Sequence, residues 1–119
     1  MPRILVLDDE PLISMMVQDW LTELAYETVG PANSVTGALG LIDSTPLDAA
    51  ILDLSLGKED CYPVAEALRA RGIPFVLVTG YGHVNVADCF QDAPILSKPI
   101  DFQAIKDAMC KLLENQVPT

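Results

Sequence analysis

Short runs of aliphatic residues alternate along this chain with longer stretches in which apolar residues recur at helical spacing. Continuous apolar runs are typical of strands that are buried on both faces of a parallel sheet. They predict strands at residues 3–7, 49–52 and 74–78, with a weaker strand at 27–30 and a short one at 95–96. The helical spacing predicts helices at residues 11–25, 34–42, 63–72 and 102–113.

Residues with special backbone preferences support several of these boundaries. Pro11 suits the first turn of a helix, and Asp101 is a good N-cap for the last one. Gly37 and Gly40 fall inside the helix expected at 34–42 and lower its intrinsic stability. That helix therefore has the weakest local signal.

The alternation of strands and helices predicts a parallel sheet with right-handed crossovers and helices on both faces. We expect an α/β fold of the flavodoxin-like, doubly wound type, with five strands in the order 2-1-3-4-5 and five helices. The remaining helix is a short one between Gly80 and Pro94, where few apolar residues are available for packing. Residues 1–119 are expected to form one domain. In such sheets, ligands bind beyond the carboxyl ends of the strands.

Composition narrows the function classes. The formal net charge of -10 disfavours direct DNA binding, which draws much of its affinity from cations placed near phosphates. Cys61, Cys89 and Cys110 are widely spaced, so neither a disulfide framework nor a zinc site is expected. No apolar run approaches the roughly 20 residues of a membrane span. A cytoplasmic protein without a membrane partner is therefore expected.

Polar residues follow four of the predicted strands. Asp8 and Asp9 come after the first strand, Asp53 after the third, Thr79 after the fourth and Lys98 after the fifth. Carboxylates gathered at one sheet edge repel one another and raise each other's pKa unless a cation neutralises them. A hard divalent ion with oxygen ligands answers this need, and magnesium in particular binds through a few carboxylates and keeps waters.

In this order and spacing the chain resembles the receiver domains of two-component response regulators over essentially its whole length. The resemblance implies that Asp53 is the phosphoacceptor and that Asp9 is a direct metal ligand. It implies that Asp8 binds the metal through water and that the backbone carbonyl of Ser55 is a further ligand. The metal would be Mg²⁺ or Mn²⁺, and Asp53 would belong to both the metal site and the reaction.

The resemblance also implies the partners and the output. A histidine kinase or a histidine phosphotransfer protein would donate the phosphoryl group, and the surface around the fourth and fifth helices would then control a downstream protein. A homodimer is compatible with this reading. The chain would be a signalling switch rather than an enzyme, with at most self-catalysed phosphoryl transfer and autodephosphorylation.

The chemistry assigns a task to two further residues. Phosphoryl transfer to a carboxylate requires compensation of the charge on the equatorial oxygens. The ammonium of Lys98 can supply this compensation, and the hydroxyl of Thr79 can donate a hydrogen bond to a phosphoryl oxygen. Movement of Thr79 toward that oxygen is the expected first step of the switch.

Several positions depart from the commonest receivers. Ile95 stands where many have an aromatic residue on the fifth strand, which puts the usual coupling of threonine and aromatic ring in doubt. The Thr79-Gly80-Tyr81 turn resembles a receiver subgroup with a Thr-Gly-Tyr or Thr-Gly-Gly turn. Tyr81 is either a substitute for the missing ring or an exposed turn residue. His83 lacks the helical surroundings of a phosphotransfer histidine.

Two other functions use similar residues. A hydrolase of the aspartyl-phosphate kind also needs Asp, magnesium, Thr and Lys, but usually carries a second Asp two residues after its nucleophile, where this chain has Ser55. A flavodoxin-like electron carrier needs hydroxyls and amides after the first strand for the flavin phosphate, where this chain is acidic.

Overall fold

The computed structural model describes residues 2–56, 59–79 and 94–114 of the chain. The main strands are β1 (Arg3–Leu7), β2 (Glu27–Ala32), β3 (Ala49–Asp53), β6 (Phe75–Thr79) and β7 (Ile95–Ser97), and the helices are α1 (Pro11–Glu23), α2 (Val35–Ser44), α3 (Tyr62–Ala70) and α4 (Phe102–Glu114). Two short strands, β4 (Ser55–Leu56) and β5 (Glu59–Asp60), pair with each other between β3 and α3. The helix expected between Gly80 and Pro94 falls outside the described residues.

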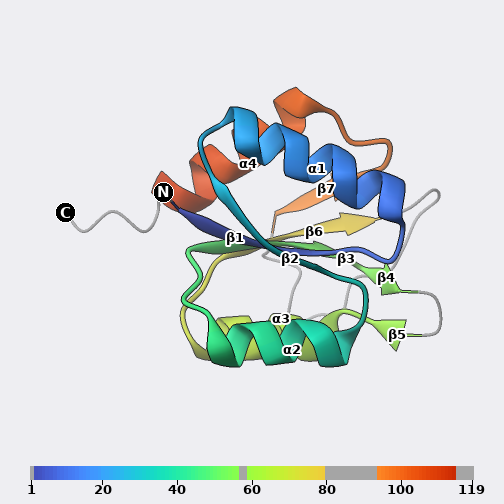
Figure 1. Cartoon of the computed structure of the whole chain (residues 1–119), viewed down its shortest axis with the longest axis vertical. Helices are drawn as coiled ribbons and strands as arrows, with labels where there is room; N and C mark the ends of the chain where they lie inside the picture. Colours follow the sequence, from blue (N-terminus) through green and yellow to red (C-terminus); the bar gives the residue numbers. More distant parts are fainter. Residues whose placement is uncertain (1, 57–58, 80–93, 115–119) are drawn as a thin grey trace.

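The five main strands form one parallel sheet in the order β2-β1-β3-β6-β7. In chain order this is 2-1-3-4-5, so the predicted strand order is confirmed. Helices α1 and α4 cover one face of the sheet, and α2 and α3 cover the other (Figure 1). The two-faced arrangement is the doubly wound architecture that the alternating pattern predicts.

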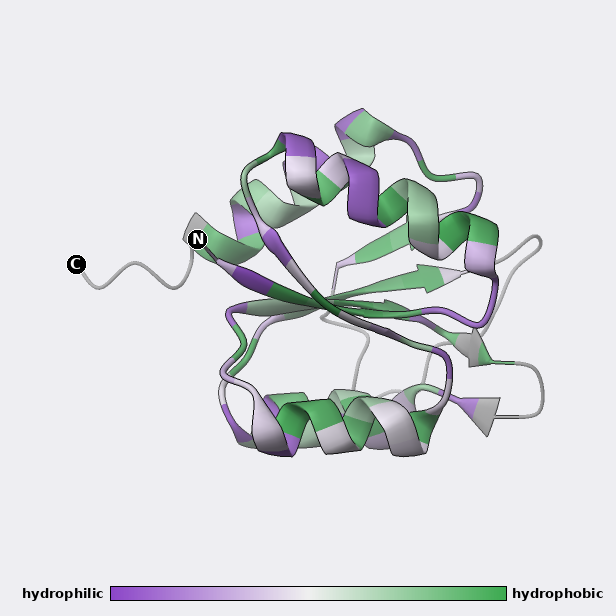
Figure 2. Cartoon of the chain, viewed as in Figure 1, coloured by the Kyte–Doolittle hydropathy of each residue, from purple (hydrophilic) through white to green (hydrophobic). Residues whose placement is uncertain are grey.

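The side chains of each strand alternate between two cores, one on each face of the sheet. Leu5, Leu7 and Leu52 pack with α2 and α3, whereas Val6 and Ile51 pack with α1 and α4. The alternation follows from the two-residue period of a strand. Strands β1, β3 and β6 are accordingly hydrophobic along most of their length (Figure 2). These apolar runs form the buried core beneath the loops at the carboxyl edge of the sheet.

Several elements extend beyond or stop short of their expected ends. Helix α2 was expected at 34–42 and spans Val35–Ser44, and α3 was expected at 63–72 and spans Tyr62–Ala70. Strand β2 was expected to end at Gly30 but continues to Ala32. Pro31 is tolerated because β2 lies at the edge of the sheet, where a missing N–H breaks no central ladder. Helix α1 was expected to reach residue 25 but ends at Glu23, since Ala25 adopts a positive φ of 65°.

Asp101 caps the last helix as expected, because its side chain accepts a hydrogen bond of 2.8 Å from the backbone N–H of Ala104.

Cys61 is buried, Cys110 is exposed and both are free thiols, while Cys89 lies outside the described residues. Within the ranges that the structure describes, no helix combines the length and the apolar composition needed to cross a membrane.

Gly40 offers a test of the α2 assignment. It lies inside the helix, and a Cβ atom built there meets no atom within 4 Å. Gly40→Ala should therefore raise the free energy of unfolding by about 0.5–1 kcal/mol, because alanine has less freedom to lose on folding. Urea denaturation measures the change.

Gly30→Ala is the opposite control. Gly30 has a φ of +98°, and a Cβ there would lie 2.7 Å from the backbone nitrogen of Ala32. The free energy of unfolding of this variant should fall by about 1 kcal/mol or more. Destabilisation by Gly40→Ala would contradict the placement of residue 40 in an exposed helix turn.

Candidate functional site

The carboxyl edge of the sheet collects the polar residues singled out in the sequence. Asp8 directly follows β1, Asp53 ends β3, Thr79 ends β6 and Lys98 directly follows β7. Asp8, Asp53 and Thr79 are buried. The backbone N–H of Lys98 donates a 2.8 Å hydrogen bond to the carbonyl of Thr79, which fixes the start of the loop that carries Lys98. Four strand ends thus present these side chains at one edge.

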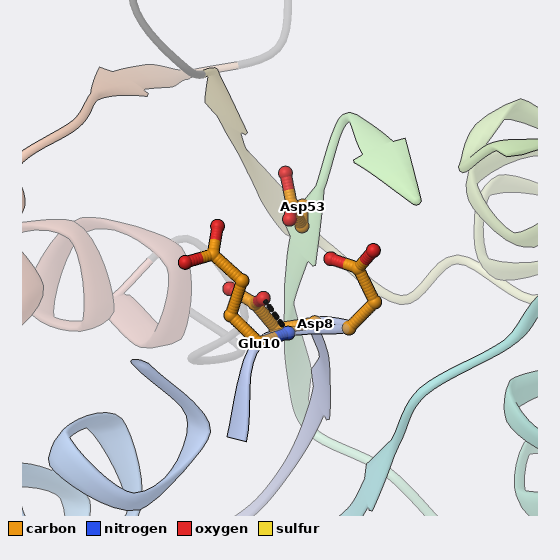
Figure 3. Close-up of side chains that lie close together, drawn as sticks. Asp8, Glu10 and Asp53 are labelled. Atoms are coloured by element: carbon orange, nitrogen blue, oxygen red, sulfur yellow. Dashed lines mark hydrogen bonds between the residues drawn. The ribbon is translucent and has the colours of Figure 1, made fainter. Parts of the chain in front are cut away.

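Four carboxylates form a compact group at this edge. Asp8, Asp9, Glu10 and Asp53 each place an oxygen within 4.8 Å of the others. Figure 3 shows the carboxylate of Asp53 projecting from β3 beside the loop that carries Asp8 and Glu10. Asp8 and Asp53 are buried, whereas Asp9 and Glu10 are exposed. An all-oxygen, strongly anionic set fits a hard divalent cation such as magnesium.

Burial raises the pKa of Asp8 to about 6, from an ordinary value of 3.8. The backbone N–H of Glu10 opposes this by donating a 2.8 Å hydrogen bond to Asp8, and the charge of Lys98 also lowers the pKa. The negative charges of Asp53 and Glu10 raise it further. Repulsion between carboxylates was expected to shift such groups, but for Asp8 the loss of hydration is the larger cause.

Lys98 is the cation that faces these carboxylates. Its Nζ atom lies 3.0 Å from Glu10 Oε1, 3.3 Å from Asp53 Oδ2 and 4.0 Å from Asp8 Oδ2. Burial lowers the pKa of Lys98, but the hydrogen bond to Glu10 and the charges of Asp53 and Asp8 outweigh it and raise the pKa above 10.5. The ammonium therefore stays charged and close to Asp53 at neutral pH.

Ser55 lies in β4, which pairs with β5. Its partner in the ladder is Asp60, and the flanking Cys61 N–H donates to the Leu54 carbonyl at 3.2 Å. Backbone groups alternate in direction along an antiparallel strand, so the Ser55 carbonyl is directed away from β5. This orientation makes the carbonyl available as a ligand next to Asp53.

A cavity of about 240 Å³ opens beside the carboxylates, between the start of α1 and the connection from β2 to α2. Its lining consists of Asp8, Asp9, Pro11, Ser14, Met15, Gln18, Pro31 and Asn33. Solvent therefore reaches one side of the cluster of four carboxylates. Such access suits an ion that keeps part of its water shell.

Glu10 was not among the predicted site residues, although its side chain contacts Lys98 directly. The run of three acidic residues after the first strand was the available signal. Two other predicted residues, Tyr81 and His83, lie outside the described residues, and Ile95 is exposed on β7.

The chain matches the response regulator receiver domain family over residues 4–110. Among solved structures, it is similar to SdrG from Sphingomonas melonis Fr1, with 45% identity, a TM-score of 0.84 and coverage of 95% of this chain and 97% of that one. It is also similar to the response regulator TrrA from Thermotoga maritima in complex with Mg²⁺ and BeF, with 31% identity and a TM-score of 0.83 over 95% of this chain and 100% of that one.

A longer relative is the transcriptional regulatory protein PdtaR from Mycobacterium tuberculosis. The two are 27% identical over 106 residues, which is 88% of this chain. The match spans 52% of PdtaR, so the chain corresponds to about half of that regulator.

Proposed function

Because the chain belongs to the response regulator receiver family, we propose that it is a phosphoacceptor switch in which Asp53 receives a phosphoryl group from a histidine kinase or a histidine phosphotransfer protein. The observation that carries the proposal is the placement of a buried aspartate at the end of the central strand β3, with Lys98 Nζ 3.3 Å from its Oδ2 atom. We further propose that residues 1–119 form one receiver domain that acts on a downstream protein.

In the proposed transfer, a carboxylate oxygen of Asp53 forms a bond to phosphorus as the bond to the donor's imidazole nitrogen breaks. Lys98 stays beside the oxygens that carry the negative charge, and the hydroxyl of Thr79 donates to one of them. The sheet supports their placement, because the backbone N–H of Lys98 donates a hydrogen bond to the backbone carbonyl of Thr79. Positioning and charge compensation supply the catalysis, so the chain needs no further acid or base.

The cluster of four carboxylates supports a divalent metal as the cofactor, Mg²⁺ or Mn²⁺. Asp9 and Asp53 would bind it directly, Asp8 through water, and Ser55 through its backbone carbonyl. When bound, the ion neutralises carboxylate charge and compensates the charge of the incoming phosphoryl group. TrrA, with which this chain shares 31% identity, was solved with Mg²⁺ and BeF bound, which supports the same cofactor here.

The proposed output is a change in the surface around the fourth and fifth helices, of which α4 (Phe102–Glu114) is the last along the chain. The other helix was expected between Gly80 and Pro94, outside the described residues. Ile95 offers no ring for the usual coupling and is 42% exposed on β7. Movement of Thr79 therefore has to be coupled to the output surface through side chains other than an aromatic residue on β7.

The test is incubation with acetyl phosphate and Mg²⁺, followed by intact-mass spectrometry and measurement of released phosphate. A switch should retain up to one phosphoryl group per chain as an acyl phosphate that hydroxylamine removes. A hydrolase would instead release phosphate rapidly over many turnovers without retaining the acyl phosphate. Absence of the acyl phosphate in the presence of both reagents would contradict the proposed function.

A further inference from the structure

Lys98 is shared between Glu10 and Asp53, and the contact with Glu10 is the shorter one. The distances are 3.0 Å to Glu10 Oε1 and 3.3 Å to Asp53 Oδ2. The Lys98 side chain is 12% exposed, whereas that of Glu10 is 59% exposed. A carboxylate at the rim of the site thus binds the cation that the phosphoryl group needs.

Two hydrogen bonds hold the backbone of Glu10 at the start of α1. Its N–H donates to Asp8 Oδ1 at 2.8 Å, and its carbonyl accepts a 3.0 Å hydrogen bond from the N–H of Ser14. Glu10 is the N-cap residue of α1, yet its side chain makes no capping hydrogen bond to the helix. It instead reaches Lys98, which is 88 residues away in the sequence.

We propose that Glu10 is a positioning residue that holds Lys98 in the resting state and competes with the phosphoryl oxygens for its ammonium. The inference rests on the proposed function, since it assigns Glu10 a role in the same switch. Phosphorylation removes the charge of the Asp53 carboxylate and places negative charge further out, on the phosphoryl oxygens. Lys98 has to follow that charge, and Glu10 opposes the movement.

Two physical effects act in the same direction. An ammonium N–H of Lys98 that donates a hydrogen bond to Glu10 is not available to a phosphoryl oxygen. The negative charge of Glu10 also repels those oxygens at short range. Glu10 therefore favours the unphosphorylated state and sets how readily the switch changes state.

The test measures the affinity for beryllium fluoride, a phosphoryl mimic, at saturating Mg²⁺ by ¹⁹F NMR or calorimetry. Glu10→Gln retains the length of the side chain but removes its charge, and should bind the mimic about threefold to tenfold more tightly than wild type. Unchanged or weaker binding would overturn the inference.

Glu10→Asp separates contact from charge. This variant keeps the negative charge, but its side chain is one methylene shorter and cannot hold Lys98 at 3.0 Å from the same backbone position. If the contact matters, Glu10→Asp should bind beryllium fluoride nearly as tightly as Glu10→Gln does. If it behaves like wild type, the effect belongs to charge alone and the positioning role is refuted.

A double-mutant cycle with Lys98→Met tests whether Glu10 acts through Lys98. The gain from Glu10→Gln should be smaller in the Lys98→Met background, because only the direct repulsion by the Glu10 charge remains there, and its full persistence would contradict the proposal. Titration with Mg²⁺ alone gives a further control: a tenfold or larger loss of Mg²⁺ affinity in Glu10→Gln would make Glu10 a metal ligand instead.

The outcomes for wild type separate this inference from the proposed function. Wild-type protein that neither binds the mimic nor accepts a phosphoryl group at Asp53 contradicts the proposed function. Wild-type protein that does both, with Glu10 variants that match it, contradicts only the role of Glu10.

Discussion

Replacement of Asp53 by Asn should lower phosphoryl transfer to the chain by at least about a hundredfold, while the fold remains intact. A carboxamide has nearly the shape of a carboxylate but is a far weaker nucleophile. Asp53 is 3% exposed at the end of the central strand, so an isosteric substitution avoids a cavity. Asn removes one of four neighbouring carboxylate charges while Lys98 keeps its contact with Glu10, so stability should be equal or higher. Labelling with acetyl phosphate and Mg²⁺, read by intact-mass spectrometry, measures the effect.

Asp43→Asn is the matched control for this substitution. Asp43 is an exposed residue of α2 that pairs with Arg71, away from the carboxylate group. Its replacement removes one carboxylate from the chain and should leave labelling unchanged. Undiminished labelling of Asp53→Asn, with circular dichroism like that of wild type, would move the phosphoacceptor to one of the neighbouring carboxylates.

The strand order and the position of the site were accessible from the sequence because buried parallel strands have a strong local signal. Residues 3–7 and 74–78 contain little except aliphatic and aromatic side chains, and they appear as β1 and β6 with ends shifted by at most one residue. The right-handed crossover rule then leaves few arrangements of such strands. It places their carboxyl ends, and the polar residues that follow, at one edge.

Other features depend on tertiary contacts that leave no local signal. Strands β4 and β5 have only two residues each, too few for a recognisable alternation, and the neighbouring Leu54 and Leu56 are buried. The contact between Glu10 and Lys98 requires the placement of two loops 88 residues apart. The size of the pKa shift of Asp8 likewise depends on its burial, which a run of three acidic residues does not reveal.

Burial of Asp8 leads to the second large prediction, that Asp8→Asn stabilises the metal-free protein at pH 7.5. The pKa of Asp8 is raised from 3.8 to about 6, so the folded state binds this proton more tightly than the unfolded chain does. The resulting penalty is fully present above pH 6 and is relieved as the pH falls through about 6 toward 4. Asn removes the charge but keeps an oxygen that can accept from the Glu10 N–H.

The free energy of unfolding of Asp8→Asn should therefore exceed that of wild type by roughly 1–3 kcal/mol at pH 7.5, and the difference should shrink to near zero by pH 4. Urea denaturation in the presence of a chelator measures it without a contribution from bound metal. Asp9→Asn is the control, because it makes the same charge change on an exposed neighbour. Its effect should stay within about 0.5 kcal/mol. An equal gain in both variants would mean that net charge, rather than the burial of Asp8, limits the stability of the metal-free protein.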